Sequence, residues 1–437
     1  MTGVFSLLPE GRPGLLLPHS EAGPGAGPSG TGPGEDLARY LAQGGYAPLP
    51  DPEVLLDRVA VAGLRGRGGA GFPAAVKLRA VRHAPGHSVV VANGEEGEPG
   101  SVKDRWLLRH RPHLVLDGLR LAAAMTGAAR GWVYLSDDHA ERAVRRALAE
   151  RPAEPTAEPN AELTAEPAVD VVRTEHTYVA GEESAVVRRV DGGPALPTAK
   201  PPRPFESGVG GAPTLVAKVE TLARIALINS QPDAAAAVAA GHLVTLSGHG
   251  GADGATALVE VPAGARLKVL ADLAGHGAAE AVLLGGMFGG LHGDGWPDLP
   301  LDHDGLHAAG TALGCGALHF LHPGDCPVAV ATEAAAYLAA QSARQCGVCV
   351  SGTGALATTL AAVARGATDD DPVGRLRRWS GQLPGRGACG LLDAAARVVA
   401  TLLDRFPHRV DAHRDGACPE CAHPAPEDGR RFRVPVP

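Results

Sequence analysis

The sequence lacks a long apolar run, a secretion leader and an excess of basic residues. Hydrophobic residues make up 45% of its 437 residues, but no uninterrupted run approaches the roughly 20 apolar residues that cross a bilayer. The first 20 residues show no basic segment followed by an apolar core and a small-residue cleavage site. We therefore expect a cytoplasmic protein without direct membrane insertion, peripheral to a membrane at most through a partner complex.

Acidic residues outnumber basic ones, with 48 Asp and Glu against 40 Lys and Arg, so the net charge is −8. No basic run with interleaved aromatic residues occurs, which excludes nucleic acid as the main partner. Cysteine, in contrast, is present at an odd count of seven, with C-x-x-C pairs at Cys346 and Cys349 and at Cys418 and Cys421. In a large chain without a leader, such pairs indicate metal or cluster ligands rather than disulfides.

A glycine-rich loop is the strongest local signal, with five glycines and two arginines in residues 63–71. The backbone N–H groups of such a loop can approach an anion closely, and phosphate is the anion that these loops commonly bind. Gly66, Gly68 and Gly71 spell G-x-G-x-x-G, but a helical pattern precedes them where the dinucleotide fingerprint requires a strand. An ordinary Rossmann dinucleotide loop is therefore disfavoured, and a plain solvent turn remains the alternative.

A carboxylate cluster follows the first predicted strand. Residues 88–92 form a β-branched run typical of a buried parallel strand, which ends at Asn93 and is followed by Glu95, Glu96 and Glu98. Ligands of open α/β sheets bind at such strand ends. The loop, Lys77 and the acidic cluster together favour a ligand site over a solvent turn.

The remaining pattern predicts an α/β fold with a Rossmann-like parallel sheet, because helices and strands alternate. We expect helices at 35–43, 52–62, 74–82, 112–126, 138–150 and 214–227, and strands at 88–92, 131–135 and 169–173. Strands near 242–247, 256–261, 280–284 and 316–321 with a helix at 267–274 indicate a second unit, and Ala-rich helices at 328–345, 353–365, 372–380 and 388–405 indicate a helical bundle.

These patterns divide the chain into five parts. A Pro- and Gly-rich lead-in at 1–34 is expected to be flexible. An α/β domain at 35–235 carries an Ala-Glu-Pro insert at 152–167, which cannot bury a core. The second unit spans 236–326, the helical domain 327–405, and a polar tail with a C-x-x-C pair 406–437.

Three motifs resemble a known family: Gly66-Arg67-Gly68-Gly69-Ala70-Gly71-Phe72-Pro73, Asn93-Gly94-Glu95-Glu96-Gly97-Glu98-Pro99-Gly100 and Lys103-Asp104-Arg105. The chain is similar to the NADH-binding flavoprotein subunit of respiratory complex I and to the diaphorase subunits of NAD-reducing hydrogenases and formate dehydrogenases. The similarity continues through Tyr178-Val179-Ala180-Gly181-Glu182-Glu183-Ser184, Lys200-Pro201-Pro202 and Val219-Glu220-Thr221 to Cys389. It implies that 236–326 is a small β-grasp domain of the soluble ligand-binding type and that the helical domain binds iron and sulfur.

The resemblance implies cofactor contacts for specific residues. FMN would be held by Gly66, Arg67, Gly68, Gly69, Lys77, Asn93, Glu95, Glu96, Gly181 and Glu182, with Tyr178 against the pocket. NADH would face Phe72, Glu98, Glu183 and Lys200, and Glu98 and Glu183 are the candidate catalytic residues. Phe72 offers a face for adenine stacking, and carboxylates can accept hydrogen bonds from ribose hydroxyls. As an alternative, Glu182 and Glu183 could simply complement a helix dipole.

Several positions depart from the family pattern. Lys218 stands where the family usually has an Asn that contacts the flavin, and we keep it as a candidate cofactor-binding residue. Leu78 stands where an aromatic commonly follows the pocket lysine, and Arg203, with Phe205 two residues on, where one commonly follows the Pro pair. We therefore predict a weaker hold on NADH or a changed cofactor preference.

The family binds a [4Fe–4S] cluster through C-x-x-C-x-x-C and one later cysteine, because four thiolates must surround a cubane. Cys346, Cys349 and Cys389 match this pattern, but Gly352 replaces the third cysteine. The fourth ligand could be Cys418 or Cys421 or a non-protein group, or the cluster could have three irons. Zinc bound by the two C-x-x-C pairs is a further alternative, as are unliganded thiols. Cys315 and Cys326 read as small core residues, and the histidines show no ligand spacing.

The resulting hypothesis is an NADH dehydrogenase module that passes electrons from NADH through FMN and an iron–sulfur cluster, one at a time, to a partner. The partner would be a ferredoxin-like or [2Fe–2S] subunit, leading onward to an electron carrier or a quinone-reductase complex. The rival hypothesis is a diverged, non-catalytic scaffold subunit that holds a nucleotide or zinc.

Overall fold

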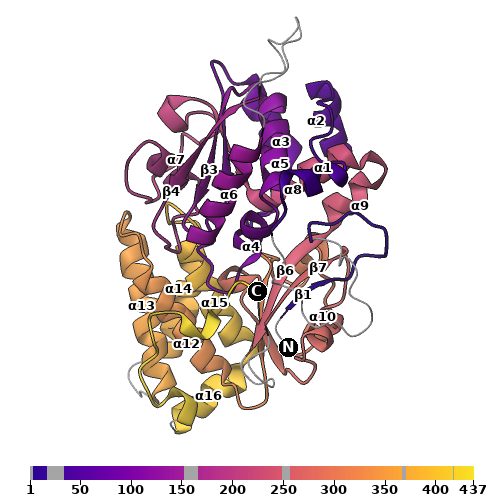
Figure 1. Cartoon of the computed structure of the whole chain (residues 1–437). Coiled ribbons are helices and arrows are strands. Elements are labelled where there is room, and N and C mark those ends of the chain that lie inside the picture. Colours follow the sequence, from indigo (N-terminus) through magenta and orange to yellow (C-terminus); the bar gives the residue numbers. More distant parts are fainter. Residues whose placement is uncertain (1–2, 17–33, 152–165, 249–255, 367–370, 417) are drawn as a thin grey trace, which may run out of the picture.

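The computed structural model describes residues 3–16, 34–151, 166–248, 256–366, 371–416 and 418–437. An α/β domain, a mixed-sheet domain and a helical bundle pack around a common junction (Figure 1). Most of the expected Ala-Glu-Pro insert lies outside the described residues.

The first domain is built on a parallel four-stranded sheet in the order β4-β3-β2-β5. Its strands are β2 (Val89–Asn93), β3 (Arg130–Leu135), β4 (Ala168–Arg173) and β5 (Thr214–Lys218). Helices α5 (Pro112–Thr126) and α8 (Val219–Ser230) pack against each other over one face of this sheet and carry much of the apolar core. The other helices of this domain are α1 (Leu37–Ala42), α2 (Pro52–Val61), α3 (Ala74–His83), α4 (Lys103–His110), α6 (Asp138–Glu150), α7 (Glu183–Val190) and α9 (Ala235–Ala240).

The expected helix over 214–227 is wrong at its beginning. Residues 214–218 form β5, which pairs in parallel with β2 along its whole length, and the helix starts only at Val219. A strand with both faces covered shows a continuous apolar run instead of alternation, so periodicity cannot distinguish it from a helix. The error matters because β5 carries Lys218 to the edge of the sheet.

The second domain contains a six-stranded mixed sheet in the order β1-β7-β6-β10-β8-β9. Strands β6 (His242–Gly248) and β7 (Ala257–Val261) pair antiparallel, and β10 (Ala317–Leu321) lies parallel to β6 between it and β8 (Ala281–Leu284). The short β9 (Leu291–His292) pairs with β8, and α10 (Leu267–Leu273) and α11 (His303–Ala308) complete the unit.

The lead-in is partly ordered, contrary to expectation. Residues Gly3–Ser6 form β1, which pairs in parallel with β7. Further on, the backbone N–H groups of Leu15 and Leu16 donate to the buried carboxylate of Glu260. The first segment of the chain therefore closes one edge of the second sheet, whereas residues 17–33 lie outside the described residues.

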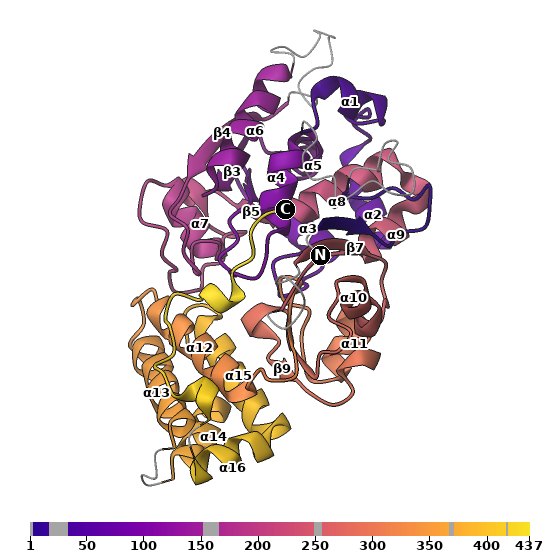
Figure 2. The ribbon, with the colours of Figure 1, turned by 60° about the horizontal axis from the view of Figure 1, so that its bottom comes forward.

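The third domain is a bundle of α12 (Pro327–Ala340), α13 (Gly347–Ala364), α14 (Pro372–Gln382), α15 (Leu391–Arg405) and α16 (Pro407–Asp415) (Figure 2). Within the described residues, α13 alone is apolar enough over 18 residues to span a membrane by length and composition. The sequence expectation overlooked it. In the structure α13 packs against α12, α14 and α15. Core helices of helical bundles also meet this criterion of length and hydropathy, so the criterion is weak evidence for a membrane span.

The tail is more structured than its polar composition suggests. After α16 the chain runs back from the bundle toward the first domain, and the C-terminus lies near the junction of the three domains (Figures 1 and 2). Phe432 and Val434 are buried there, and the Val434 N–H donates to the Pro99 carbonyl at 3.1 Å. The tail thus contacts the loop that carries the acidic cluster.

Candidate functional site

The strand order reverses between β2 and β5, which makes the carboxyl ends of these strands a topological switch point. Asn93 and Lys218 end the two strands and are register partners. In open α/β sheets the ligand crevice lies at such a point. The tertiary structure therefore places the predicted Asn93 and the anomalous Lys218 side by side at the edge where a nucleotide is expected.

The glycine loop folds over this edge between α2 and α3. It is pinned at its base by the Gly66 N–H, which donates to the Phe72 carbonyl at 2.8 Å, and it passes through positive φ at Gly69 and Gly71. A Cβ at position 68 would lie 3.4 Å from Cγ of Lys218. The loop therefore approaches the switch point closely, and Phe72 is 53% exposed and free to stack on a ligand.

Arg67 behaves differently from the expectation that its side chain holds FMN. Its guanidinium is buried and donates to the carbonyls of Ala239 and Gly241 and lies 2.7 Å from Nδ1 of His242. These partners belong to α9 and the start of the second domain. The Arg67 side chain therefore joins two domains, while its backbone N–H donates to Oγ1 of Thr221 at 3.0 Å.

The three glutamates of the acidic cluster are all buried but have separate roles. Glu96 accepts hydrogen bonds from the Arg105 N–H at 2.9 Å and from Oγ of Ser101 at 2.6 Å, so it ties the loop to the start of α4. Although burial would raise its pKa, Arg105 and neighbouring Lys103 hold the pKa of Glu96 below its ordinary value. This predicted FMN contact is thus already engaged inside the protein.

Glu95 and Glu98 face the site region and the domain junction. The Glu95 carboxylate lies 2.8 Å from Nδ1 of His176, and its Oε2 is buried with no hydrogen-bond partner among the described residues. Glu98 accepts from the Met287 N–H at 3.1 Å and from the Tyr178 hydroxyl at 3.4 Å. Burial raises the pKa of Glu98 to about 7.

The Lys218 side chain extends from the end of β5 to the loop that carries the acidic residues. Its ammonium donates to the Glu95 carbonyl and lies 3.3 Å from Asp104. Asp104 is also bound by Lys103, 2.7 Å away, and Lys103 in turn lies 3.1 Å from Glu220. This buried ion network was not predicted, although Lys103 and Asp104 belong to the Lys103-Asp104-Arg105 motif.

The predicted NADH-side charges gather at the start of α7. Lys77 lies 3.1 Å from Glu183 and donates to the Val216 carbonyl at 2.9 Å, while Lys200 binds Glu182 and lies 3.7 Å from Glu183. Burial alone would raise the pKa of Glu183, but Lys77 and Lys200 hold it below the ordinary value. Glu182 also caps α7 by accepting from the Ser184 N–H at 3.0 Å, so the helix-dipole alternative holds in part.

The two positions where an expected aromatic residue is replaced, Leu78 and Arg203, lie in different surroundings. Leu78 is 1% exposed and belongs to the core of the first domain, so its side chain is not on the ligand side. Arg203 is exposed and lies 3.9 Å from Glu183. Only the Arg203 substitution therefore changes the surface near the predicted NADH side.

These residues fit a phosphorylated flavin in the chemistry of their donors. The switch point holds the Lys218 ammonium and the Asn93 amide, which donates to the Gly181 carbonyl at 2.8 Å and accepts from the Glu95 N–H at 3.2 Å. The glycine loop supplies close backbone approach, and a Cβ at Gly181 would lie 2.8 Å from the Glu95 carbonyl oxygen. Lysine ammonium groups and loop N–H groups are the groups that bind phosphate. The site as described is compact, because Lys218 crosses it to Glu95 and Asp104.

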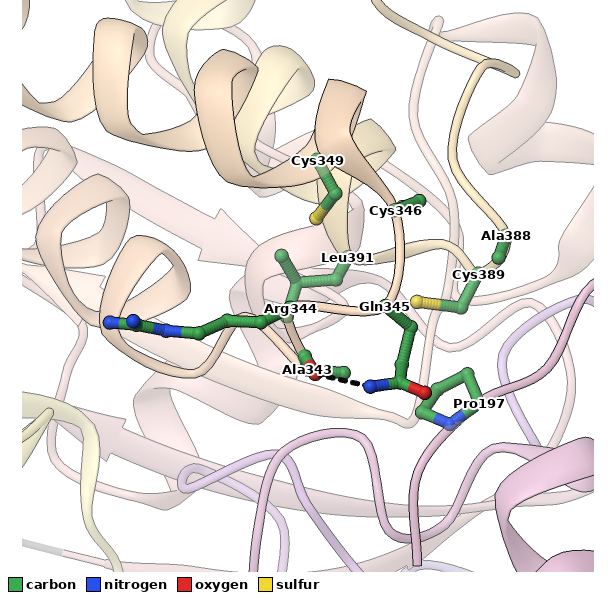
Figure 3. A pocket seen from close by; sticks show the side chains of 9 residues that line it. All are labelled: Pro197, Ala343, Arg344, Gln345, Cys346, Cys349, Ala388, Cys389 and Leu391. Carbon is green, nitrogen blue, oxygen red and sulfur yellow. Dashed lines mark hydrogen bonds between the residues drawn. The ribbon is translucent and has the colours of Figure 1, made fainter.

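The second site is a small pocket lined by Cys346, Cys349 and Cys389 (Figure 3). Cys349 lies on the first turn of α13 and Cys389 just before α15, while Pro197 of the first domain closes one side. Burial raises the pKa of Cys349 to about 11 and also raises that of Cys389. Three thiols on one pocket fit an iron–sulfur cluster with three protein ligands.

The space beside Gly352, where the family has its third motif cysteine, is not open to a fourth cluster ligand. A Cβ at this residue would lie 3.0 Å from Cδ1 of Leu392 and 3.2 Å from Leu383. The space that a third motif cysteine needs is therefore filled by leucine side chains. Cys418 and Cys421, which were one alternative for the fourth ligand, lie instead against Cys326 and His413.

That tail group also corrects two other expectations. The zinc alternative paired Cys418 and Cys421 with the cysteines of α13, but their neighbours are Cys326 and His413. Cys326 is a buried core residue, as expected, but it directly precedes α12 instead of lying in a strand, and its thiol belongs to this group. His413 lies five residues before Cys418, so this local spacing was a sequence signal that the predictions missed, whereas the distant Cys326 could be added only by the fold.

The fold and the two sites together define a nucleotide-binding redox protein with a cluster domain. Residues 59–227 match the family described as Nuo51 FMN-binding domain, and residues 329–413 match the NADH-ubiquinone oxidoreductase-F iron-sulfur binding region. The chain belongs to the family of FMN- and iron–sulfur-binding subunits of NADH-quinone oxidoreductases. The expected family, α/β fold class and cofactor set are thereby confirmed.

Relatives show the extent of the similarity. An NADH-quinone oxidoreductase subunit of Rhizobium meliloti is 30% identical over 411 residues, covering 88% of this chain and 96% of that protein. The HndC protein of the NADP-reducing hydrogenase of Solidesulfovibrio fructosivorans is 28% identical over 88% of this chain and 82% of its own length. A solved NAD+-reducing [NiFe]-hydrogenase in the H2-reduced state superposes with a TM-score of 0.72 at 29% identity, covering 84% of this chain and 63% of that one.

Proposed function

We propose that this chain oxidises NADH at the switch point between β2 and β5 and delivers the electrons through a cluster held by Cys346, Cys349 and Cys389. FMN supplies the chemistry, since it accepts a hydride from NADH and releases electrons singly. The chain's own residues would bind and orient the two nucleotides. Asn93 and Lys218 lie at the flavin side, and Phe72, Glu183 and Lys200 at the NADH side.

The observation that carries this proposal is the closeness of the two sites. Pro197, three residues before Lys200, lines the cysteine pocket, and Arg188 of α7 donates at 3.1 Å to Gln345 beside Cys346. In addition, the Tyr178 N–H donates at 3.1 Å to Gln341, which ends α12 just before the segment with Cys346. A donor site and a cluster pocket that share a wall are what sequential electron transfer requires.

Residue roles follow from the charges. Lys77 and Lys200 keep Glu183 ionised, so its carboxylate can accept hydrogen bonds from ribose hydroxyls. Such positioning contributes to the roughly 7–11 kcal/mol that fixed geometry can remove from a barrier. Glu98, with its raised pKa, is placed to hold a proton beside Tyr178 at the domain junction.

The acceptor would be a ferredoxin-like or [2Fe–2S] subunit, reached from the cluster pocket. Related proteins are named as subunits of NADH-quinone oxidoreductase and of NADP-reducing hydrogenase, which supports membership of a multisubunit complex. We place the protein in the cytoplasm, peripheral to a membrane only through such a complex.

Anaerobic absorption and EPR spectra before and after NADH test the proposal. The purified chain should carry about one FMN, show a flavin spectrum that bleaches with NADH, and contain iron with acid-labile sulfide. Cys349→Ser and Cys389→Ser should lower the iron content, whereas Cys315→Ser should not. A chain that binds no flavin after reconstitution would overturn the proposal.

A scaffold protein without electron transfer is the second candidate, supported by the leucines that fill the space beside Gly352 and by Lys218 in the flavin site. It predicts bound nucleotide without NADH-dependent bleaching and no acid-labile sulfide. The same spectra therefore separate the two functions.

A further inference from the structure

A group of three cysteines and one histidine lies outside the proposed redox sites and joins two ends of the helical domain. The potential ligand atoms of Cys326, His413, Cys418 and Cys421 all lie within 4.8 Å of one another. Cys326, Cys421 and His413 are buried, and Cys418 is half-buried. Neither the family match for the cluster domain, which ends at residue 413, nor the expected cluster motif includes both tail cysteines.

The distances agree with ligands of one tetrahedral ion. A zinc ion with bonds of about 2.3 Å to sulfur and about 2.0–2.1 Å to nitrogen separates two sulfurs by roughly 3.8 Å and sulfur from nitrogen by roughly 3.6 Å. Here Sγ of Cys326 and Sγ of Cys421 are 3.8 Å apart, and Nε2 of His413 lies 3.6 Å from the first and 3.3 Å from the second. A disulfide is excluded, because bonded sulfurs are about 2.05 Å apart.

The histidine is already oriented as a ligand. Nδ1 of His413 lies 2.6 Å from the Arg409 carbonyl, which can only accept, so Nδ1 carries the hydrogen. The lone pair of Nε2 then faces the two thiols. A backbone carbonyl that fixes the tautomer in this way is the usual outer partner of a metal-bound histidine.

The tail cysteines form a tight turn of the kind found in structural zinc sites. The Cys421 N–H donates to the Cys418 carbonyl at 3.0 Å across the 3-10 turn Pro419–Cys421. C-x-x-C turns supply two adjacent tetrahedral positions. A cubane needs its thiolates further apart than the ligands of a single ion, because each binds a different iron.

We infer that Cys326, His413, Cys418 and Cys421 bind a structural zinc ion that fastens the C-terminal segment across the domain junction. Four protein ligands leave no open position, so the site is structural rather than catalytic. It ties the residue before α12 to the end of α16 and to the tail.

The residues beyond Cys421 explain what the ion would hold in place. Arg431 makes a two-pronged ion pair with Glu333 of α12, with both contacts at 2.8 Å. Phe432 then packs against His319 of β10, and Val434 binds the Pro99 carbonyl beside Glu98. A zinc ion at the base of this segment would therefore anchor a strap that contacts all three domains.

Metal analysis of the full-length chain without an affinity tag, purified anaerobically, tests the inference. We expect about one zinc per chain in addition to any iron. Cys421→Ser and Cys418→Ser should remove the zinc and leave the iron unchanged. Cys349→Ser should do the reverse, and Cys315→Ser should keep both metals. Because Cys418 is half-buried, its variant is expected to fold even if the Cys421 variant does not.

Cobalt provides an independent readout of the ligand set. Co²⁺ added to the zinc-depleted chain should give intense visible bands of a tetrahedral site and a sulfur-to-metal charge-transfer band, and both should be lost in Cys418→Ser. Zinc removal by a chelator should also speed tryptic cleavage at Arg430, Arg431 and Arg433 severalfold. Absence of zinc from the wild-type chain together with a weak, octahedral cobalt spectrum would overturn the inference, as would zinc that persists in both tail variants.

Discussion

The Lys218 ammonium lies 3.3 Å from the Asp104 carboxylate and also donates to the Glu95 carbonyl, so one side chain spans the proposed flavin site. Lys77 and Lys200, the other lysines of the site, are each paired with a glutamate. Lys218 is distinguished by its position at the end of β5, opposite Asn93 at the switch point, where the family usually has a neutral amide.

We predict that Lys218→Met weakens FMN binding at least about tenfold, because a hydrogen bond to a charged group contributes about 1.5–3 kcal/mol. Riboflavin, which has no phosphate, should lose much less. Fluorescence titration of both ligands measures the difference. Lys268→Met is the matched control, since Lys268 lies on α10 and pairs only with exposed Asp272. Equal losses for FMN and riboflavin would contradict a phosphate contact.

Glu98 makes stability depend on pH in an unusual direction. Burial raises its pKa from 4.5 to about 7, so the folded chain holds this proton more tightly than the unfolded chain. The resulting stabilisation, of order 3 kcal/mol, is complete below the unfolded pKa and is lost as pH rises through 7. Urea midpoints between pH 5 and 8 should fall for the wild type and stay flatter for Glu98→Gln.

Glu96 provides the contrast for that measurement. Arg105 and Lys103 hold its pKa low despite burial, so its contribution is present above its unfolded pKa and is lost on acidification. Glu96→Gln should therefore lower the midpoint at neutral pH without flattening the decline between pH 5 and 8. If both variants change the profile alike, the assignment to Glu98 is wrong.

Arg67 is expected to matter for stability more than for flavin binding. Arg67→Lys keeps the charge but cannot reach the Ala239 and Gly241 carbonyls with a fork, and the unpaired buried groups should cost about 2–4 kcal/mol. Arg65→Lys on the same loop is the control, because its partner Asp304 is exposed and the pair should contribute less than about 1 kcal/mol. Urea unfolding and FMN titration of the folded protein should show a stability loss for Arg67→Lys alone, with FMN affinity within about threefold.

Gly352→Cys would restore the family motif, but the new side chain would clash with the side chains of Leu392 and Leu383. We predict a loss of about 1–3 kcal/mol from overpacking in the single variant. Adding Leu383→Ala removes two of the three close contacts, so it should relieve part of the overpacking and raise the iron content per chain above that of the wild type. Leu383→Ala alone, measured by iron analysis and EPR, is the control. No gain of iron in the double variant would show that this position cannot reach the cluster.

Local patterns were sufficient for much of the fold. Helices α5 and α6 have the predicted bounds, and β2 and β3 differ from prediction by one residue at their ends. The helical bundle was also predicted, with some boundaries displaced. These elements have strong periodicity or β-branched runs, and such signals act between residues that are close in sequence.

The sites required more than local patterns. The loop and carboxylate motifs indicated a nucleotide, but the direction of a side chain depends on its neighbours in space. Arg67 turns toward α9, and Leu78 turns into the core, which no motif states. His413 lies only eight residues from Cys421, but its other partner Cys326 is 87 residues away, and only the fold brings that cysteine to the group.

The sequence by itself determined the class of chemistry, because glycine-rich backbone, carboxylates and paired cysteines have specific ligand preferences regardless of where they meet. Only the tertiary structure decided which of them meet. Strand pairing brought Asn93 and Lys218 together, and the return of the tail separated Cys418 and Cys421 from the cluster pocket and placed them beside Cys326 and His413. The physical reason is that long-range pairing is set by burial of whole faces, which no short window of residues contains.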